Sequence, residues 1–119
     1  VGPDPQIGHP VKPEQGCYTE LRHFATMLDN KGVEFIVVIL PVMQGWAAVH
    51  DSDGTARARF SKSVKAALAS TKAIVVDGMA DWSAPDSAFA DPVHLQWPAT
   101  AGFTRFVWET ARSQDAHSQ

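Results

Sequence analysis

The sequence has little cysteine and no long apolar run. Cys17 is the only cysteine among the 119 residues, so the chain can form neither an internal disulfide nor a metal cage of cysteine thiolates. No apolar stretch approaches the roughly 18 to 20 residues that a membrane-spanning helix requires. The ten basic residues, against thirteen acidic ones, are not gathered on one face, which argues against a nucleic acid as partner. No secretion signal is visible, and the cellular compartment stays open.

The prolines of this chain are concentrated at its amino end. Residues 1–16 hold four prolines and three glycines without a periodic apolar pattern, which is typical of a linker or arm. The remaining residues are enough for one domain with a modest core. We therefore expect a linker or arm over residues 1–16, a partial α/β domain over residues 17–112 and a polar, frayed tail over residues 113–119.

Two stretches carry the apolar periodicity of a helix. The first runs from Cys17 to Asn30, and Gly32 follows it as a stop signal. The second runs from Thr55, whose hydroxyl can cap a helix, to about Ser70. The residues predicted to face the core are Tyr18, Leu21, Phe24, Ala25 and Leu28 in the first helix, and Phe60, Val64, Ala67 and Leu68 in the second.

Two apolar runs predict strands. Residues 35–40 are six consecutive apolar residues, four of them β-branched, which indicates a strand buried on both faces and therefore a parallel sheet. Residues 73–76 predict a second, shorter strand. A helix between two such strands predicts a right-handed crossover. The stretch 42–54 is then a long loop at the carboxyl end of the first strand, where open α/β sheets form binding clefts.

A sheet of two strands is incomplete. Two parallel strands with three helices are expected to leave one strand edge and one sheet face uncovered, although residues 35–40 are apolar on both faces. The sequence therefore predicts half a sheet. The other half lies in a part of the protein outside this sequence, or the chain pairs with itself.

The segment after Gly78 loses regularity for about twenty residues before a last helical pattern. That helix is predicted to begin at Ala99 or Thr100, after Pro98. Its core-facing residues are predicted to be Phe103, Phe106, Val107 and Ala111.

An acid and an imidazole stand three residues apart in this irregular segment, in the order Asp91-Pro92-Val93-His94. Pro92 biases Asp91 away from the helical region, so an extended turn presents the pair. There the carboxylate can accept a hydrogen bond from the imidazole ring and set its tautomer. This is what a general base needs when it serves a hydroxyl nucleophile. The alternative is an aspartate that caps a turn beside an exposed histidine.

The order of these segments carries a family resemblance. A buried strand ends at Pro41, a second ends at Asp77, residues 89–95 read FADPVHL, and the closing helix contains Phe103-Thr104. Over about residues 18–111 this resembles the C-terminal half of the SGNH, or GDSL-type, hydrolases. It is most similar to the branch that includes cell-envelope polysaccharide O-acetylation proteins. The resemblance implies part of a flavodoxin-like parallel sheet flanked by helices, with His94 as general base and Asp91 as its orienting partner.

The sequence departs from the family pattern. Gln96 stands where an asparagine is common, and Ala99 where a glycine usually opens the last helix. The Gly-Asp-Ser block and the blocks with the oxyanion glycine and asparagine are not found. No serine of this chain follows a buried strand in a Gly-x-Ser-x-Gly or Gly-Asp-Ser turn. The serines considered as substitutes are Ser52, Ser61, Ser63, Ser70, Ser83 and Ser87.

Other side chains of the predicted cleft have weaker support as ligands. Trp46, Trp82 and Trp97 fall in predicted loops, where their rings either stack on a sugar or acyl group or pack internally. Residues 50–54, read HDSDG, begin like a calcium loop, but the twelfth position from Asp51 is Lys62 instead of a bidentate acid. A metal site of Asp91, His94 and either His50 or Asp77 has no supporting ligand spacing. We expect no metal and no cofactor.

Two function classes follow from these observations. The first is the C-terminal portion of an SGNH-type serine esterase or O-acyltransferase that acts on acyl esters of carbohydrate, with its nucleophile elsewhere. The resemblance places such a protein in the periplasm or outside the cell. The second is a non-catalytic α/β module that binds a partner or glycan. A flavodoxin-like ligand-binding domain is disfavoured because a glycine-rich phosphate loop is missing.

Overall fold

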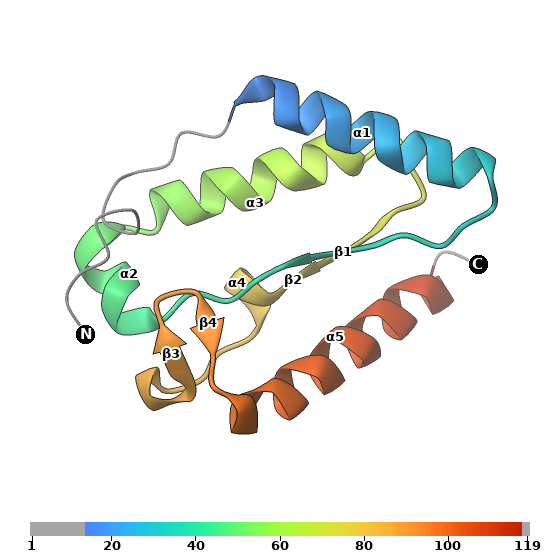
Figure 1. Ribbon diagram of the computed structural model, residues 1–119. Coiled ribbons are helices and arrows are strands. Elements are labelled where there is room, and N and C mark those ends of the chain that lie inside the picture. Colours follow the sequence, from blue (N-terminus) through green and yellow to red (C-terminus); the bar gives the residue numbers. More distant parts are fainter. Residues whose placement is uncertain (1–13, 118–119) are drawn as a thin grey trace.

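The computed structural model describes residues 14–117, and these form helices on both sides of a short parallel sheet, with a small hairpin at one end (Figure 1). This confirms the α/β class. None of the helices in this range is long and apolar enough to cross a membrane. In chain order the elements are α1 (Gln15–Asn30), β1 (Ile36–Ile39), α2 (Gln44–His50), α3 (Thr55–Leu68), β2 (Ile74–Asp77), α4 (Gly78–Asp81), the 3₁₀ helix η1 (Asp86–Ala88), β3 (Phe89–Asp91), β4 (His94–Leu95) and α5 (Trp97–His117).

The two predicted strands pair in parallel. Ile36 of β1 lies beside Ile74 of β2, and Ile39 lies beside Asp77. The crossover between the strands contains α2 and α3. The carboxyl ends of β1 and β2 therefore lie at the same end of the sheet, and both strands continue there into the segments that carry the candidate site residues.

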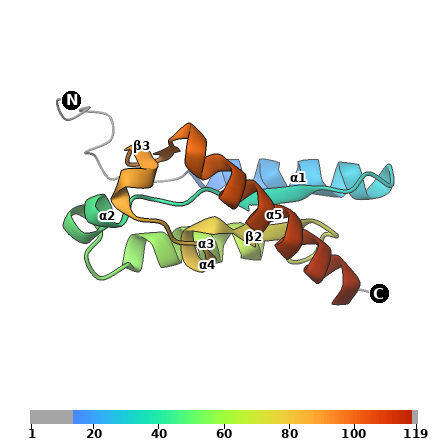
Figure 2. The same ribbon diagram turned by 90° about the horizontal axis from the view of Figure 1, so that it is seen from below.

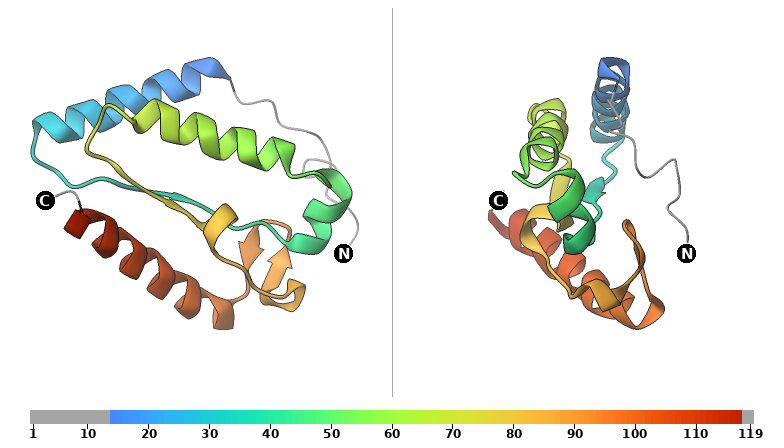
Figure 3. Two further views of the ribbon diagram at one scale, coloured as in Figure 1. Left: turned by 180° about the vertical axis from the view of Figure 1, so that it is seen from behind. Right: turned by 90° about the vertical axis from the view of Figure 1, so that its left-hand side faces the viewer.

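Helices cover both faces of the sheet, which corrects the expectation of an uncovered face. The pair α1 and α3 packs on one face and α5 on the other, against β2 (Figure 1; Figure 3, right). Ala111 is the fully buried contact of α5. Within residues 14–117, no strand pairs with the outer edge of β1. The buried core of the first face consists of Ala25, Ile39, Val64 and Leu68.

Two predicted core residues lie at the surface instead. Phe60 of α3 is exposed, and its neighbour Ser61 is buried in contact with the interior. Phe24 of α1 is exposed as well, although its ring packs edge-on against Phe35 at 5.2 Å between centroids. The apolar pattern predicted both helices, but it did not predict which face of α3 is buried, because the polar Ser61 and not Phe60 points toward the interior.

The region 42–54 is not a continuous loop, because α2 occupies its first half. The amide of Gly45 in the first turn donates to Asp86 Oδ1 at 3.1 Å. Within α2 the rings of Trp46 and His50 stack at 4.6 Å between centroids. The carboxylate that accepts this amide at the start of α2 is 41 residues away in sequence. A local sequence pattern cannot predict such a contact.

The last helix is longer than predicted at both ends. It begins at Trp97, since Pro98 in a first helical turn loses no hydrogen bond. It continues to His117 through most of the segment that we expected to fray. Arg112 forms an ion pair with Glu34 at 2.6 Å. The amide of Gln114 donates to the main-chain oxygen of Val75 at 3.0 Å. These contacts fix the end of α5 to the sheet. Residues 1–13 of the predicted arm and residues 118–119 of the tail lie outside the described range.

Gly78 allows the close approach of β1 and α5 at the end of β2. A Cβ atom there would lie 2.7 Å from the carbonyl oxygen of Ile39 and 2.7 Å from the ring of Phe103. We expect Gly78→Ala to destabilise the fold by about 1–3 kcal/mol, because the main-chain oxygen cannot move aside freely. The matched control is Gly102→Ala in α5, whose Cβ would meet nothing within 4 Å. It should stabilise the protein by about 0.5–1 kcal/mol. Urea unfolding of the two variants measures both effects, and equal effects would contradict the packing argument.

Candidate active site

The Asp91–His94 segment forms a tight hairpin. β3 and β4 pair antiparallel, with Phe89 opposite Leu95 and Asp91 opposite His94. Pro92 and Val93 make the turn between the strands. Phe89 is buried and anchors the hairpin to the body of the protein. The two candidate side chains therefore stand next to each other at a fixed turn, as Pro92 led us to expect.

The Asp91 carboxylate holds the His94 ring. His94 Nδ1 lies 2.7 Å from Asp91 Oδ2 and 2.9 Å from Oδ1. Oδ1 also accepts the amides of Val93 and His94, each at 2.9 Å. The Val93 amide lowers the pKa of Asp91 most; partial burial opposes this, and the His94 ring and amide lower the pKa further. Asp91 therefore stays ionised to lower pH than an ordinary aspartate.

This contact assigns the free nitrogen of the imidazole. An ionised carboxylate can only accept hydrogen bonds, so the Nδ1 of His94 carries the hydrogen that Asp91 binds. The Nε2 lone pair then points away from Asp91. No residue in the range 14–117 forms a hydrogen bond with Nε2, and the side chain is 72% exposed. An imidazole that a carboxylate orients, and whose other nitrogen is open, can take a proton from a hydroxyl group.

The hairpin lies at the carboxyl end of the parallel strands. The amide of Met43, four residues after β1, donates to the main-chain oxygen of Pro92 at 2.9 Å. The contact of Asp86 with Gly45 joins the same two segments a second time. Figures 1 and 2 show the hairpin beside α2, at the end where β1 stops. Ligands of open α/β sheets bind at this end. Sequence reading missed Met43, Gly45 and Asp86 as positioning residues because their contacts are long-range.

The three candidate tryptophans lie in different surroundings. Trp46 lies on α2 and stacks on His50. Trp82 packs edge-on against Phe103 at 5.1 Å, which is an internal packing contact. Trp97 is 87% exposed at the start of α5, three residues after His94. Within residues 14–117, no ring pair or hydrogen bond joins any of the three to His94. Trp97 is the ring whose surface is free for a ligand.

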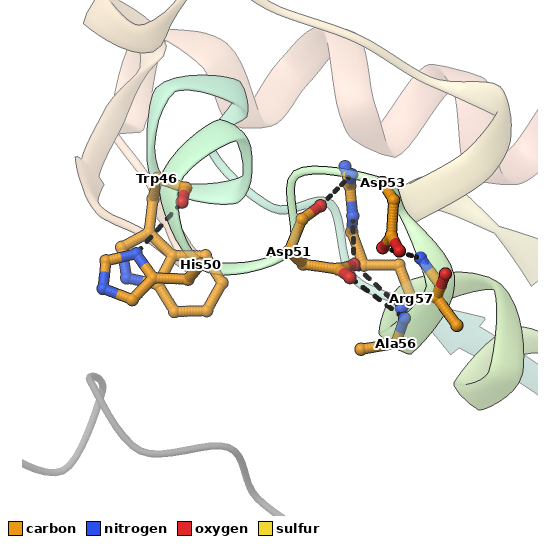
Figure 4. Close-up of polar contacts among 7 residues, drawn as sticks. Trp46, His50, Asp51, Asp53, Ala56 and Arg57 are labelled. Carbon is orange, nitrogen blue, oxygen red and sulfur yellow. Dashed lines mark hydrogen bonds and ion pairs between the residues drawn. The ribbon is translucent and has the colours of Figure 1, made fainter.

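The acidic residues after α2 cap α3. Asp51 accepts the amides of Ala56 and Arg57, each at 3.0 Å, and pairs with the Arg57 guanidinium at 2.9 Å (Figure 4). Burial alone would raise the pKa of Asp51, but the bonds from Ala56 and Arg57 outweigh it and lower the pKa. Asp53 accepts the amide of Thr55 at 3.0 Å. The carboxylates do the capping that we predicted for Thr55, and both are occupied in doing so.

The described residues offer neither a metal cluster nor a nucleophile beside His94. No group of three or more His, Cys, Asp or Glu side chains between residues 14 and 117 is placed to hold a metal ion. None of the serines in this range hydrogen-bonds to His94. A hollow of about 210 Å³ lies between α3 and α4, and another of about 460 Å³ lies along α1. Neither is lined by Asp91 or His94. The side chains of His94 and Asp91 are 72% and 37% exposed, so within residues 14–117 the pair lies on open surface.

Protein-family models, curated proteins and solved structures were compared with this chain, and none of the three comparisons finds a match. What the structure shows of a site is the contact between Asp91 and His94 and the position of their hairpin at the carboxyl end of the parallel strands.

Proposed function

We propose that this chain is the C-terminal portion of an SGNH-type serine esterase or O-acyltransferase, built on part of a flavodoxin-like sheet. The observation that carries the proposal is the 2.7 Å contact of His94 Nδ1 with Asp91, at the carboxyl end of two parallel strands. The resemblance of residues 89–95 to the D-x-x-H-L segment of that family supports it. The substrate class is an ester-linked acyl group, of carbohydrate by the same resemblance.

In the proposed reaction each of the two side chains has its own role. Nε2 of His94 takes the proton of a serine hydroxyl as that oxygen attacks the ester carbonyl. Asp91 stabilises the imidazolium that forms and keeps the ring oriented. His94 then returns the proton to the leaving alcohol, which leaves an acyl-serine. In the second half of the reaction, His94 takes a proton from water or a sugar hydroxyl as that oxygen attacks the acyl-serine. His94 then returns the proton to the serine oxygen, whose bond to the acyl group breaks.

A serine-directed fluorophosphonate tests this function. The probe should label one serine of the polypeptide as its gene encodes it, and peptide mapping should place that serine outside residues 14–117. His94→Ala should remove the label, since the attacking oxygen then keeps its proton. A label on a serine within residues 14–117 would contradict the missing nucleophile, and no label at all would contradict the enzyme.

The second function is a glycan-binding module. The observation that favours it is the exposed indole of Trp97, three residues after His94 in the chain, together with the exposed Asp91–His94 pair. Aromatic faces bind sugar rings, and such binding needs no nucleophile. The labelling experiment separates the two functions, because a binding module gives no labelled serine.

A further inference from the structure

The two edges of the sheet differ in their main-chain hydrogen bonds. The amide of Ile74 donates to the oxygen of Phe35 at 2.9 Å. Because main-chain groups of a strand alternate in direction, Phe35, Val37 and Ile39 face β2, whereas Ile36 and Val38 face away from it. Nothing in residues 14–117 hydrogen-bonds to the outward groups of Ile36 and Val38. The outer edge of β1 is therefore open.

The opposite edge is partly closed. Val75 of β2 faces outward, and its oxygen accepts the side-chain amide of Gln114 from α5 at 3.0 Å. An edge protected by a side chain of the same domain is a common end of a sheet, whereas an unprotected apolar edge recruits another strand. Further strands of this sheet therefore belong beside β1.

The side chains along β1 agree with this assignment. Ile36, Val37 and Val38 are apolar, yet each is only partly buried. Leu40, directly after β1, is 56% exposed. A strand beside β1 would bury the apolar side chains along this edge, which the helices on the two faces leave partly exposed. Burial of such surface stabilises by roughly 25 cal/mol per Å².

The open edge and the histidine lie on the same side of the molecule. Seen end-on, the β3–β4 hairpin lies on the β1 side of the sheet, away from β2 (Figure 3, right). The view from below shows the same arrangement (Figure 2). A strand parallel to β1 would end at the level where Met43 binds Pro92. The loop that follows that strand would then lie next to the β3–β4 hairpin, which carries His94.

We infer that the open edge of β1 receives, in parallel, an apolar strand from the part of the protein that carries the nucleophilic serine. The inference rests on the proposed function, since it is the serine that the docked part brings to His94. Docking of this strand would complete the sheet and, at the same time, bring the serine to the catalytic site.

Amide hydrogen exchange on the polypeptide as its gene encodes it tests the docking. The amides of Ile36 and Val38 should be as protected as those of Val37 and Ile39, because all four are then hydrogen-bonded. Val38→Pro removes one outward donor without touching the bonds to β2. It should expose the Ile36 amide and slow fluorophosphonate labelling by about 10²-fold through misplacement of the serine. Val75→Pro is the matched control, an outward valine on the other edge, and should leave labelling unchanged.

The outcomes separate this inference from the proposed function. Fast exchange at Ile36 and Val38 in a polypeptide that is still labelled at a serine would overturn the docking and leave the enzyme standing. Protected amides without any labelling would overturn the enzyme. Protection that depends on protein concentration, with the mass of a dimer, would assign the edge to a second copy and overturn the inference. The exchange measurement needs no variant, so a misfolded Val38→Pro does not weaken it.

Discussion

Replacement of His94 by alanine is expected to lower ester hydrolysis by the polypeptide as its gene encodes it by about 10²–10⁴-fold. The reason is that, in the proposed reaction, Nε2 of His94 takes the serine proton, and no second imidazole in residues 14–117 contacts Asp91. The loss should fall on kcat and on kcat/KM alike, because the interaction is made in the transition state. Hydrolysis of an aryl acetate and of an acetylated sugar measures it.

Asp91→Asn refines the same test. An asparagine oxygen still accepts the amides of Val93 and His94, so the hairpin keeps its shape. Its NH₂ group, however, presents a donor to His94 Nδ1 and favours the wrong tautomer of the ring. By analogy with other triads, this should cost about 10⁴-fold in kcat. His23→Ala removes an exposed histidine of α1 and serves as the matched control. Equal activity of His94→Ala and His23→Ala would rule out His94 as the base.

Local patterns predicted those parts of the fold that local patterns control. The helix at residues 17–30 and the two strands were located to within about two residues of their ends. The hairpin at Pro92 was predicted as an extended turn because proline restricts the residue before it. The contact between Asp91 and His94 could be predicted as well, since only two residues separate them.

Long-range contacts control the parts that the sequence did not reveal. α2 begins where Asp86 accepts the amide of Gly45, and neither residue signals the other. The end of α5 stays helical because of Glu34 and Val75, which lie far back in the chain. The position of the hairpin at the end of β1 depends in the same way on Met43 and Pro92. Sequence spacing thus predicted the acid–base pair, and tertiary contacts decided where it lies.

Asp77, the last residue of β2, carries a buried carboxylate. Asp77 is only 2% exposed. Its Oδ1 accepts the amide of Ala80 at 3.0 Å. Its Oδ2 forms an ion pair with the ammonium of Lys65 at 3.0 Å. Burial alone would raise the pKa of Asp77, but Lys65, Ser61 and the Ala80 amide outweigh burial and lower it.

We expect Lys65→Met to destabilise the fold by about 2 kcal/mol at pH 7, which is below the roughly 3–5 kcal/mol that breaking a fully buried ion pair costs. The discount reflects Lys65 itself, whose side chain is 51% exposed and loses little hydration in the pair. The variant leaves the Asp77 carboxylate buried without its cation. Lys62→Met, an exposed lysine on the same helix, is the matched control and should change stability by less than about 0.5 kcal/mol.

The contribution of Asp77 to the stability of the fold should change with pH in opposite directions in the native chain and in Lys65→Met. In the native chain the pKa of Asp77 is lowered by folding, so its stabilising effect is present above the unfolded value of about 3.9 and is lost as the pH falls through the folded value. Without Lys65, burial dominates and the folded pKa lies above the unfolded one. The folded state then binds the proton more tightly, so the contribution of Asp77 to stability rises as the pH falls from 7 toward 4.

Urea unfolding at pH 7 and pH 5 measures the free energy of unfolding of both variants. The loss of stability in Lys65→Met should be smaller at pH 5 than at pH 7, whereas the small change in Lys62→Met should be the same at both pH values. A Lys65→Met deficit that is the same at both pH values would show that the lysine stem, and not its charge, stabilises the end of β2.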